Sequence, residues 1–323
     1  MENFNGNGLL ITDYRILTTN YETTMFERVL QSDVLHQAAQ KLRAGEELKL
    51  AGVWGSASAL VAAALGRLKK TPVLMVVNHL DDADAAADDI EIFLKETGAV
   101  AHNFPAWEAQ LATDHVSEEV TGERLRLLNL LADPETADEK VEFIVAPILA
   151  LLQPVPTRHA LEAGRLRLAR GQTIPPNNLL AWLTDGGYEH VDQVDQQGEF
   201  AHRGGIVDVF PPGARTALRA EFFGDEIESL RLFDLDTQRS VEEVQAYDLT
   251  SMAVGRSVDR LLEDQRQTHF SPQDATLATT NLFDYLPPET IVCMTEPSEI
   301  RELADQLYDR IRDDLADEAS PVA

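Results

Sequence analysis

The stretch LAGVWGSASALVAAAL, residues 50 to 65, has the spacing of a phosphate-binding loop. An apolar run leads into Gly52, Gly55 and Ser56, and an alanine-rich helical pattern follows. A working loop of the form G-x-x-x-x-G-K-[ST] cradles phosphates with backbone N–H groups, reaches them with a lysine and holds Mg²⁺ with a hydroxyl. Aligned from Gly52, the lysine position holds Ser58 and the hydroxyl position holds Ala59. The stretch therefore predicts a strand, a turn and a helix whose N-terminal N–H groups alone are suited to an anion.

The elements that must position this loop alternate between short apolar runs and helical patterns. Strand-length runs lie at 48–51, 73–77, 99–104 and 143–146, and apolar residues recur at helical spacing in 81–97 and 117–132. Such alternation is typical of a parallel α/β sheet with helices on both faces. Within it we expect Trp54 to fill space beside the turn.

The pattern changes near residue 154 and changes back near 249. Residues 165–171 alternate like a strand, 177–187 read as a short helix, 188–194 as a strand, and two long β-like segments with glycine turns follow. A predicted buried strand at 291–294 and a predicted helix from Pro297 return to the alternation of strands and helices seen before residue 154. We therefore expect a tail at 1–25, an α/β domain at 26–153, an inserted α+β domain at 154–248 and the rest of the α/β domain at 249–323.

Composition narrows the possible functions. The net charge of −28 opposes sequence-independent DNA binding, which needs Lys and Arg on phosphates. The one cysteine, Cys293, lies in an apolar run and predicts a buried structural thiol in a reducing compartment. Neither the eight histidines nor this cysteine have metal-site spacing, so we expect no metal. No apolar run is long enough to span a membrane, and no secretory signal is present, which indicates a cytoplasmic protein.

The most specific pattern in the chain lies between residues 198 and 240. It reads GEFAHRGGIVDVFPPG and, after a short gap, EFFGDEIESLRLFDLDTQRS. This segment closely resembles the damage-binding module shared by the repair helicase UvrB and the transcription-repair coupling factors. So many matching positions over some forty residues make the resemblance far more specific than a lone glycine motif.

Three details favour the coupling factors over UvrB. The phosphate loop is degenerate, whereas UvrB keeps an intact G-S-G-K-T. Residues 104–109 read FPAWEA where UvrB carries a tyrosine-rich hairpin, and residues 281–300, NLFDYLPPETIVCMTEPSEI, are similar to the DYLP segment of the coupling factors. The resemblance covers roughly residues 26–315. It implies the N-terminal UvrB-like module, domains 1a, 2 and 1b, with a degenerate RecA-like P-loop domain and an inserted UvrB domain 2.

The resemblance also identifies the second half of the nucleotide site. In active enzymes of this fold, an apolar strand ends in Asp-Glu, where the Asp helps to hold Mg²⁺ and the Glu polarises water. Here the strand at 291–294 ends in Thr295 and Glu296. With lysine, hydroxyl and aspartate all absent, we expect no catalytic residue, no nucleotide cofactor and no ATP hydrolysis.

The arginines of the middle segment are the candidates for partner binding. The planar guanidinium pairs bidentately with carboxylates, which makes Arg203, Arg219 and Arg231 contact candidates. Arg203 also occupies the arginine of F-x-x-R-G, which in both families lies on the surface that binds the repair protein UvrA. Ala201 and Glu189 stand where these families often carry further arginines. The partner-binding residues we expect are Glu189, Phe200, His202, Arg203, Gly204 and Arg219.

The resemblance thus implies a non-catalytic adaptor. It would recruit UvrA to stalled RNA polymerase in transcription-coupled nucleotide excision repair, while RNA polymerase and DNA would be contacted by parts of the family's longer members outside this sequence. The alternative is a nucleotide-dependent, UvrB-type DNA helicase, which needs the missing lysine, aspartate and aromatic hairpin. A small-molecule-binding α/β protein would leave the 198–240 pattern unexplained.

Overall fold

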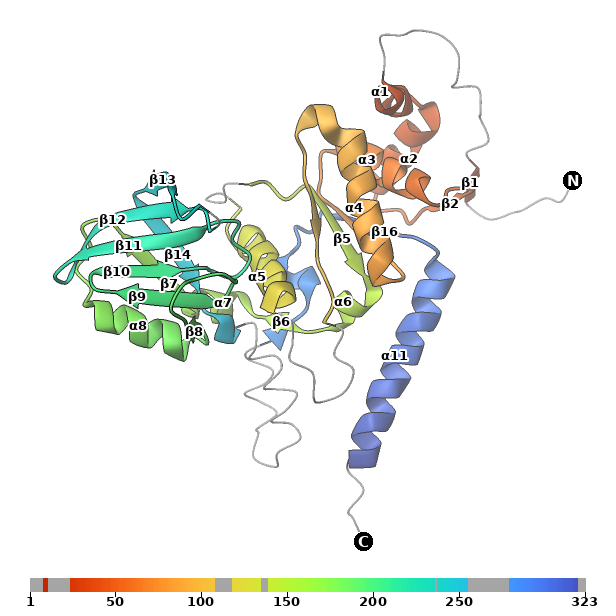
Figure 1. The fold of residues 1–323 in the computed structure, drawn as a ribbon. Helices are drawn as coiled ribbons and strands as arrows, with labels where there is room; N and C mark the ends of the chain where they lie inside the picture. Colours follow the sequence, from red (N-terminus) through yellow and green to blue (C-terminus); the bar gives the residue numbers. More distant parts are fainter. Residues whose placement is uncertain are drawn as a thin grey trace, which may run out of the picture. The chain divides into compact units, whose positions relative to one another are not determined.

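A computed structural model describes residues 8–10, 24–107, 118–134, 139–235, 237–254 and 279–318. The chain divides into two compact units, whose elements are labelled in Figure 1. The first comprises Met1–Phe104, Asp138–Ala150 and Leu286–Ala323, and the second comprises Pro105–Ala137 and Leu151–Tyr285. Within the described ranges, no helix has the length and apolar character required to cross a bilayer.

The first unit is built on a parallel four-stranded sheet, as the alternation in its sequence predicts. The strand order is β16 (Ile291–Met294), β3 (Val73–Val77), β5 (Phe143–Pro147) and β4 (Ala101–Asn103). Every residue of β3 and β5 is buried, which explains why these strands read as continuous apolar runs. The other elements are β1 (Gly8–Leu10), α1 (Met25–Leu30), α2 (Asp33–Arg43), β2 (Lys49–Ala51), α3 (Ser56–Lys69), α4 (Leu80–Leu94), the 3-10 turn η2 (Lys95–Thr97), α6 (Ile148–Leu152) and α11 (Pro297–Glu318).

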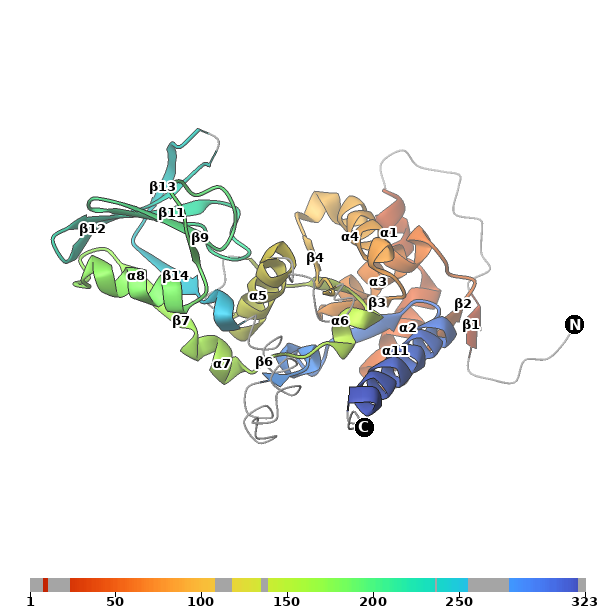
Figure 2. The same ribbon diagram turned by 60° about the horizontal axis from the view of Figure 1, so that its bottom comes forward.

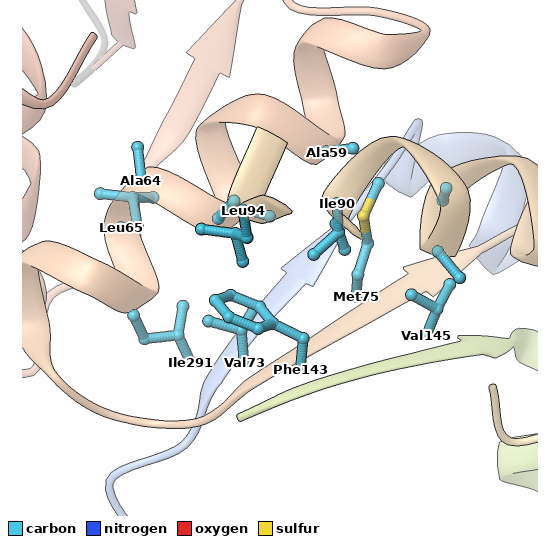
Figure 3. Packing of buried hydrophobic residues seen from close by; sticks show 14 of the residues in the cluster. Ala59, Ala64, Leu65, Val73, Met75, Ile90, Leu94, Phe143, Val145 and Ile291 are labelled. Atoms are coloured by element: carbon cyan, nitrogen blue, oxygen red, sulfur yellow. The ribbon is translucent and has the colours of Figure 1, made fainter. Parts of the chain in front are cut away.

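The core of this unit joins α3 and α4 to the sheet. Figure 3 shows Leu65 of α3 and Ile90 of α4 among the side chains of β3, β5 and β16. The small residues of α3 let its backbone approach closely, and Gly66 is needed because a Cβ there would lie 2.7 Å from Val73 Cγ2 and 2.9 Å from the Phe143 ring. Cys293 is partly buried against this cluster, and burial raises its pKa to about 12, so the thiol is protonated at neutral pH.

The second unit is α+β with mostly antiparallel sheets, also as predicted. Its main sheet has the order β13-β12-β11-β10-β9-β8, and only the β8–β9 pair is parallel. Helix α8 (Pro176–Asp185) runs along one face of this sheet in Figures 1 and 2 and buries Leu179 and Leu183 against it. The strands are β8 (Glu189–His190), β9 (Glu199–Arg203), β10 (Ile206–Val209), β11 (Ala217–Phe223), β12 (Glu226–Phe233) and β13 (Ser240–Val244).

Shorter elements complete the second unit. Strand β7 (Arg165–Ala169) pairs with β14 (Ala246–Thr250), and β6 (Val155–Pro156) pairs with β15 (Thr279–Thr280). Helices α5 (Glu118–Ala132) and α7 (Arg158–Ala163) and the 3-10 turn η3 (Leu282–Tyr285) lie in the same unit. The strand expected at 188–194 is wrong in length. It stops at His190, because the chain then turns and Val191 makes the last backbone bond to Phe200.

We predict that Tyr188→Phe destabilises the second unit. The buried Tyr188 hydroxyl donates to the Thr250 carbonyl at 2.7 Å, and burial raises the pKa of this phenol well above 10.0. Removing the hydroxyl leaves that carbonyl without its donor, so the free energy of unfolding should fall by about 1–2 kcal/mol. Urea denaturation measures this, with Tyr308→Phe, a position 68% exposed, as the control. Equal midpoints for the two variants would contradict the prediction.

Candidate functional sites

The phosphate-like loop forms the predicted strand, turn and helix. Strand β2 ends at Ala51, the turn passes through Gly52 and Gly55 at φ 80° and 57°, and α3 starts at Ser56. Both glycines occupy the left-handed region that other residues avoid. Nothing lies within 4 Å of a Cβ built on Gly55, so its backbone angles, and not lack of space, require glycine there.

The loop and the end of β16 lie in one pocket of about 300 Å³. Its walls come from the loop, the carboxyl ends of β3 and β16, and α4. The structure therefore brings together the two sequence segments that the resemblance identified as the halves of a vestigial nucleotide site. The lining includes Gly55, Ser56, Ser58, Ala59, Thr295 and Glu296, while Gly52 shapes the turn. Trp54 lines the pocket beside the turn, but its side chain is 69% exposed, so it does not fill space there as a buried residue would.

The residues after β16 form hydrogen bonds with β3 and with the residue that follows β3. Thr295 donates to the Val76 carbonyl through its backbone N at 3.0 Å and its Oγ1 at 3.1 Å. The Asn78 amide donates to Glu296 Oε2 at 3.3 Å and to Glu299 Oε2 at 3.0 Å. The hydrogen bond with Glu296 and its negative charge raise the pKa of Glu299. Thr295 thus continues the pairing of β16 with β3. The carboxylates of Glu296 and Glu299 both accept from the Asn78 amide.

The pocket is acidic. Of the residues that the structure describes, Asp82, Asp89 and Glu296 are the ionisable ones that line it, and no lysine or arginine does. Among the described residues, no cluster of three His, Cys, Asp or Glu side chains could hold a metal ion. A triphosphate would therefore meet three carboxylates at the position where a working loop offers a lysine and Mg²⁺.

The second candidate site is the hairpin of β9 and β10. Arg203 pairs with Ile206, so only Gly204 and Gly205 form the loop, which is a tight turn. Gly204 has φ 61°, and a Cβ on Gly205 would lie 2.8 Å from the Phe222 carbonyl oxygen. Two-residue hairpin loops favour glycine because their backbone angles require a positive φ.

Some of the expected partner-binding residues lie on the surface of the hairpin, and others are buried beneath it. Arg203 is exposed, and its guanidinium donates through Nε at 3.2 Å and through Nη2 to the backbone carbonyl of Asp192. His202 is half-buried with its Nε2 2.8 Å from the Gly204 carbonyl oxygen. Phe200 is buried and stacks on His190 with 4.9 Å between ring centroids, so it supports the hairpin from behind.

The other expected partner contacts are placed differently. Arg219 makes a bidentate pair with Asp208 on the neighbouring strand, at 2.7 and 2.8 Å, and lies over the Phe233 ring. The hydrogen bond to Asp208 raises the pKa of Arg219, so this guanidinium is committed to the sheet. Glu189 is exposed on the edge strand and pairs with Glu199, near the far end of β9 from Arg203.

Two exposed apolar residues beside Arg203 were missed by the sequence reasoning. Ile206 is the cross-strand neighbour of both Arg203 and Glu221, and Phe223 follows two residues after Glu221 on the same face. Phe223 is 79% exposed. Alternation along β11 indicates that only one of Phe222 and Phe223 points inward, a signal present in the sequence.

Comparisons with known proteins agree with this architecture. The UvrB interaction domain family matches residues 166–253, which lie within the second unit. The transcription-repair-coupling factor of Escherichia coli is 33% identical over 64% of this chain and 18% of its own length. That of Bacillus subtilis is 25% identical over 86% of this chain and 27% of its own length. That of Mycobacterium bovis is 35% identical over 71% of this chain and 18% of its own length.

The segment that carries the hairpin therefore matches the UvrB interaction domain family. The chain belongs to the family of the transcription-repair coupling factors, as an N-terminal UvrB-like module. It spans between 18% and 27% of the length of these three relatives.

Proposed function

We propose that this chain is a non-catalytic adaptor of transcription-coupled nucleotide excision repair that recruits UvrA. The observation that carries the proposal is the exposed Arg203 at the glycine turn of a UvrB interaction domain. Contacts to RNA polymerase and DNA are assigned to other parts of the longer family members. A cytoplasmic location is part of the same proposal, since repair of bacterial DNA takes place there.

The chemistry of the hairpin surface suits a protein partner with a carboxylate. A guanidinium has five N–H donors, and Arg203 uses donors on Nε and Nη2 to hold the Asp192 carbonyl, which fixes its direction. The remaining donors are available in a forked geometry that matches a carboxylate. Exposed Ile206 lies opposite Arg203 on the neighbouring strand, and exposed Phe223 lies one strand further on. Apolar residues near an arginine exclude water from such a contact.

We further propose that the first unit is a degenerate RecA-like P-loop domain without NTPase activity. Ser58 and Ala59 replace the lysine and hydroxyl, Thr295 replaces the aspartate, and the pocket between them carries three carboxylates. These features argue against the alternative, a UvrB-type helicase. In this proposal the domains run over 26–153, 154–248 and 249–323, after a tail at 1–25. Residues 108–109 of the FPAWEA motif lie outside the described residues.

We predict that Arg203→Ala lowers the affinity for UvrA by about 30-fold or more, because truncating a buried charge contact at an interface costs about 2 kcal/mol or more. Titration calorimetry with UvrA of the same source measures this. Arg215→Ala is the matched control, because Arg215 is an exposed arginine in the loop at the opposite end of β10 and β11. Its affinity should stay within about twofold of wild type. An unchanged affinity for Arg203→Ala, with an unchanged melting curve, would remove Arg203 from the interface.

We also predict that ATP with Mg²⁺ is neither hydrolysed nor bound. Millimolar nucleotide should shift the melting temperature by less than about 1 °C, because a ligand that does not bind the folded state cannot stabilise it. Differential scanning fluorimetry and a phosphate-release assay test this, with intact UvrB as the positive control. A shift of several degrees would show that the loop still binds nucleotide.

A further inference from the structure

The pocket beside the phosphate-like loop favours a ligand of positive charge. It contains Asp82, Asp89 and Glu296, a formal charge of about −3. The first turns of α3 and α4 contribute to its wall, and each helix N-terminus carries about +0.5. These partial charges together reach about +1, which leaves the pocket negative.

A buried, unpartnered acceptor lines the same pocket. Asn78 is 8% exposed, and its Oδ1 accepts no hydrogen bond within the part of the chain that the structure describes. The orientation of the amide is fixed, because Nδ2 donates to Glu296 and Glu299 and the reverse orientation would face oxygen with oxygen. A buried acceptor without a donor costs about 1–3 kcal/mol. The polar side chains that line the pocket thus offer mainly hydrogen-bond acceptors. A ligand with N–H donors would satisfy them.

The shape of the pocket suits an elongated cation. Asp82 and Asp89 are seven residues apart on α4, which places them about 10 Å apart along the helix axis. Ala85 and Ala86 lie between them, and Met75 and Val77 form apolar wall from β3. Trp54 adds an exposed ring at the pocket, where indole faces attract ammonium groups.

We propose that this pocket binds an aliphatic ammonium chain in place of a nucleotide. Alkyl carbons would lie on the alanines and Trp54, and ammonium groups would donate to Asp89, Glu296 and the Asn78 Oδ1. A free polyamine and a lysine side chain of a partner protein share this chemistry. The proposal does not depend on UvrA binding, because all its residues belong to the first unit.

The test uses the full chain, spermidine as the probe, and titration calorimetry in 150 mM NaCl to suppress general attraction to an acidic protein. Asp89→Asn should lower the affinity at least about fivefold, as expected for the loss of one charge at short range. Asp88→Asn is the matched control, because Asp88 is exposed on the same helix and does not line the pocket. Its affinity should remain within about twofold of wild type. Glu296→Gln provides a second variant if Asp89→Asn fails to fold.

A parallel titration with the peptide acetyl-Gly-Lys-Gly-amide distinguishes the two sources. Binding of spermidine that depends on Asp89 supports a free polyamine, and binding of the peptide alone with the same dependence supports a lysine side chain. Equal spermidine affinities for wild type, Asp89→Asn and Asp88→Asn would overturn the proposal, because the binding would then reflect only net charge. Failure of both probes to bind would overturn it as well.

Discussion

The register of the β9–β10 hairpin determines which side chains of the second unit reach the surface. Side chains alternate along a strand, so a slip of one residue would exchange the two faces. With Arg203 opposite Ile206, Val207 and Phe200 point into the core while Arg203 remains exposed. The glycine pair allows this register, since the left-handed backbone angle of Gly204 disfavours other residues and a Cβ on Gly205 would lie 2.8 Å from the Phe222 carbonyl oxygen.

Ion pairs within the sheet distinguish arginines that stabilise the fold from arginines whose guanidinium can still bind a partner. Arg219 reaches Asp208 directly across the ladder and lies over Phe233, so removing it would leave a partly buried carboxylate unpaired. Within the described part of the chain, Arg203 instead holds only a backbone carbonyl, which orients the guanidinium without neutralising it. The same residue type therefore has two roles, and the cross-strand neighbour decides which role it takes.

The first unit has the strand, turn and helix of a phosphate loop without the lysine and hydroxyl that such a loop uses. Ala59 is buried in the core and Thr295 pairs with β3, so both positions serve packing or sheet pairing. Asp82, Asp89 and Glu296 make the pocket beside this loop acidic. Packing of α3 and α4 on the sheet stabilises this arrangement.

Much of this architecture was predictable from sequence, because apolar periodicity reports burial directly. The buried strands β3 and β5, the strand β7 and the helix α8 follow from their patterns. The contacts between side chains could not be predicted from these patterns. The Arg219–Asp208 pair depends on the register of two strands, and the exposure of Trp54 depends on a backbone turn whose angles composition does not reveal. The nearness of the exposed Ile206 and Phe223 was likewise missed, because β10 and β11 become neighbours only through strand pairing.

Amide hydrogen exchange of the chain with and without saturating UvrA tests the central claim most directly. Slow exchange reports amides shielded by a partner or by stable hydrogen bonds. The account predicts added protection over residues 199–206 and 221–226, with exchange of α3 and α4 unchanged. Protection confined to the first unit, or no change in the hairpin of a complex shown to have formed, would contradict it.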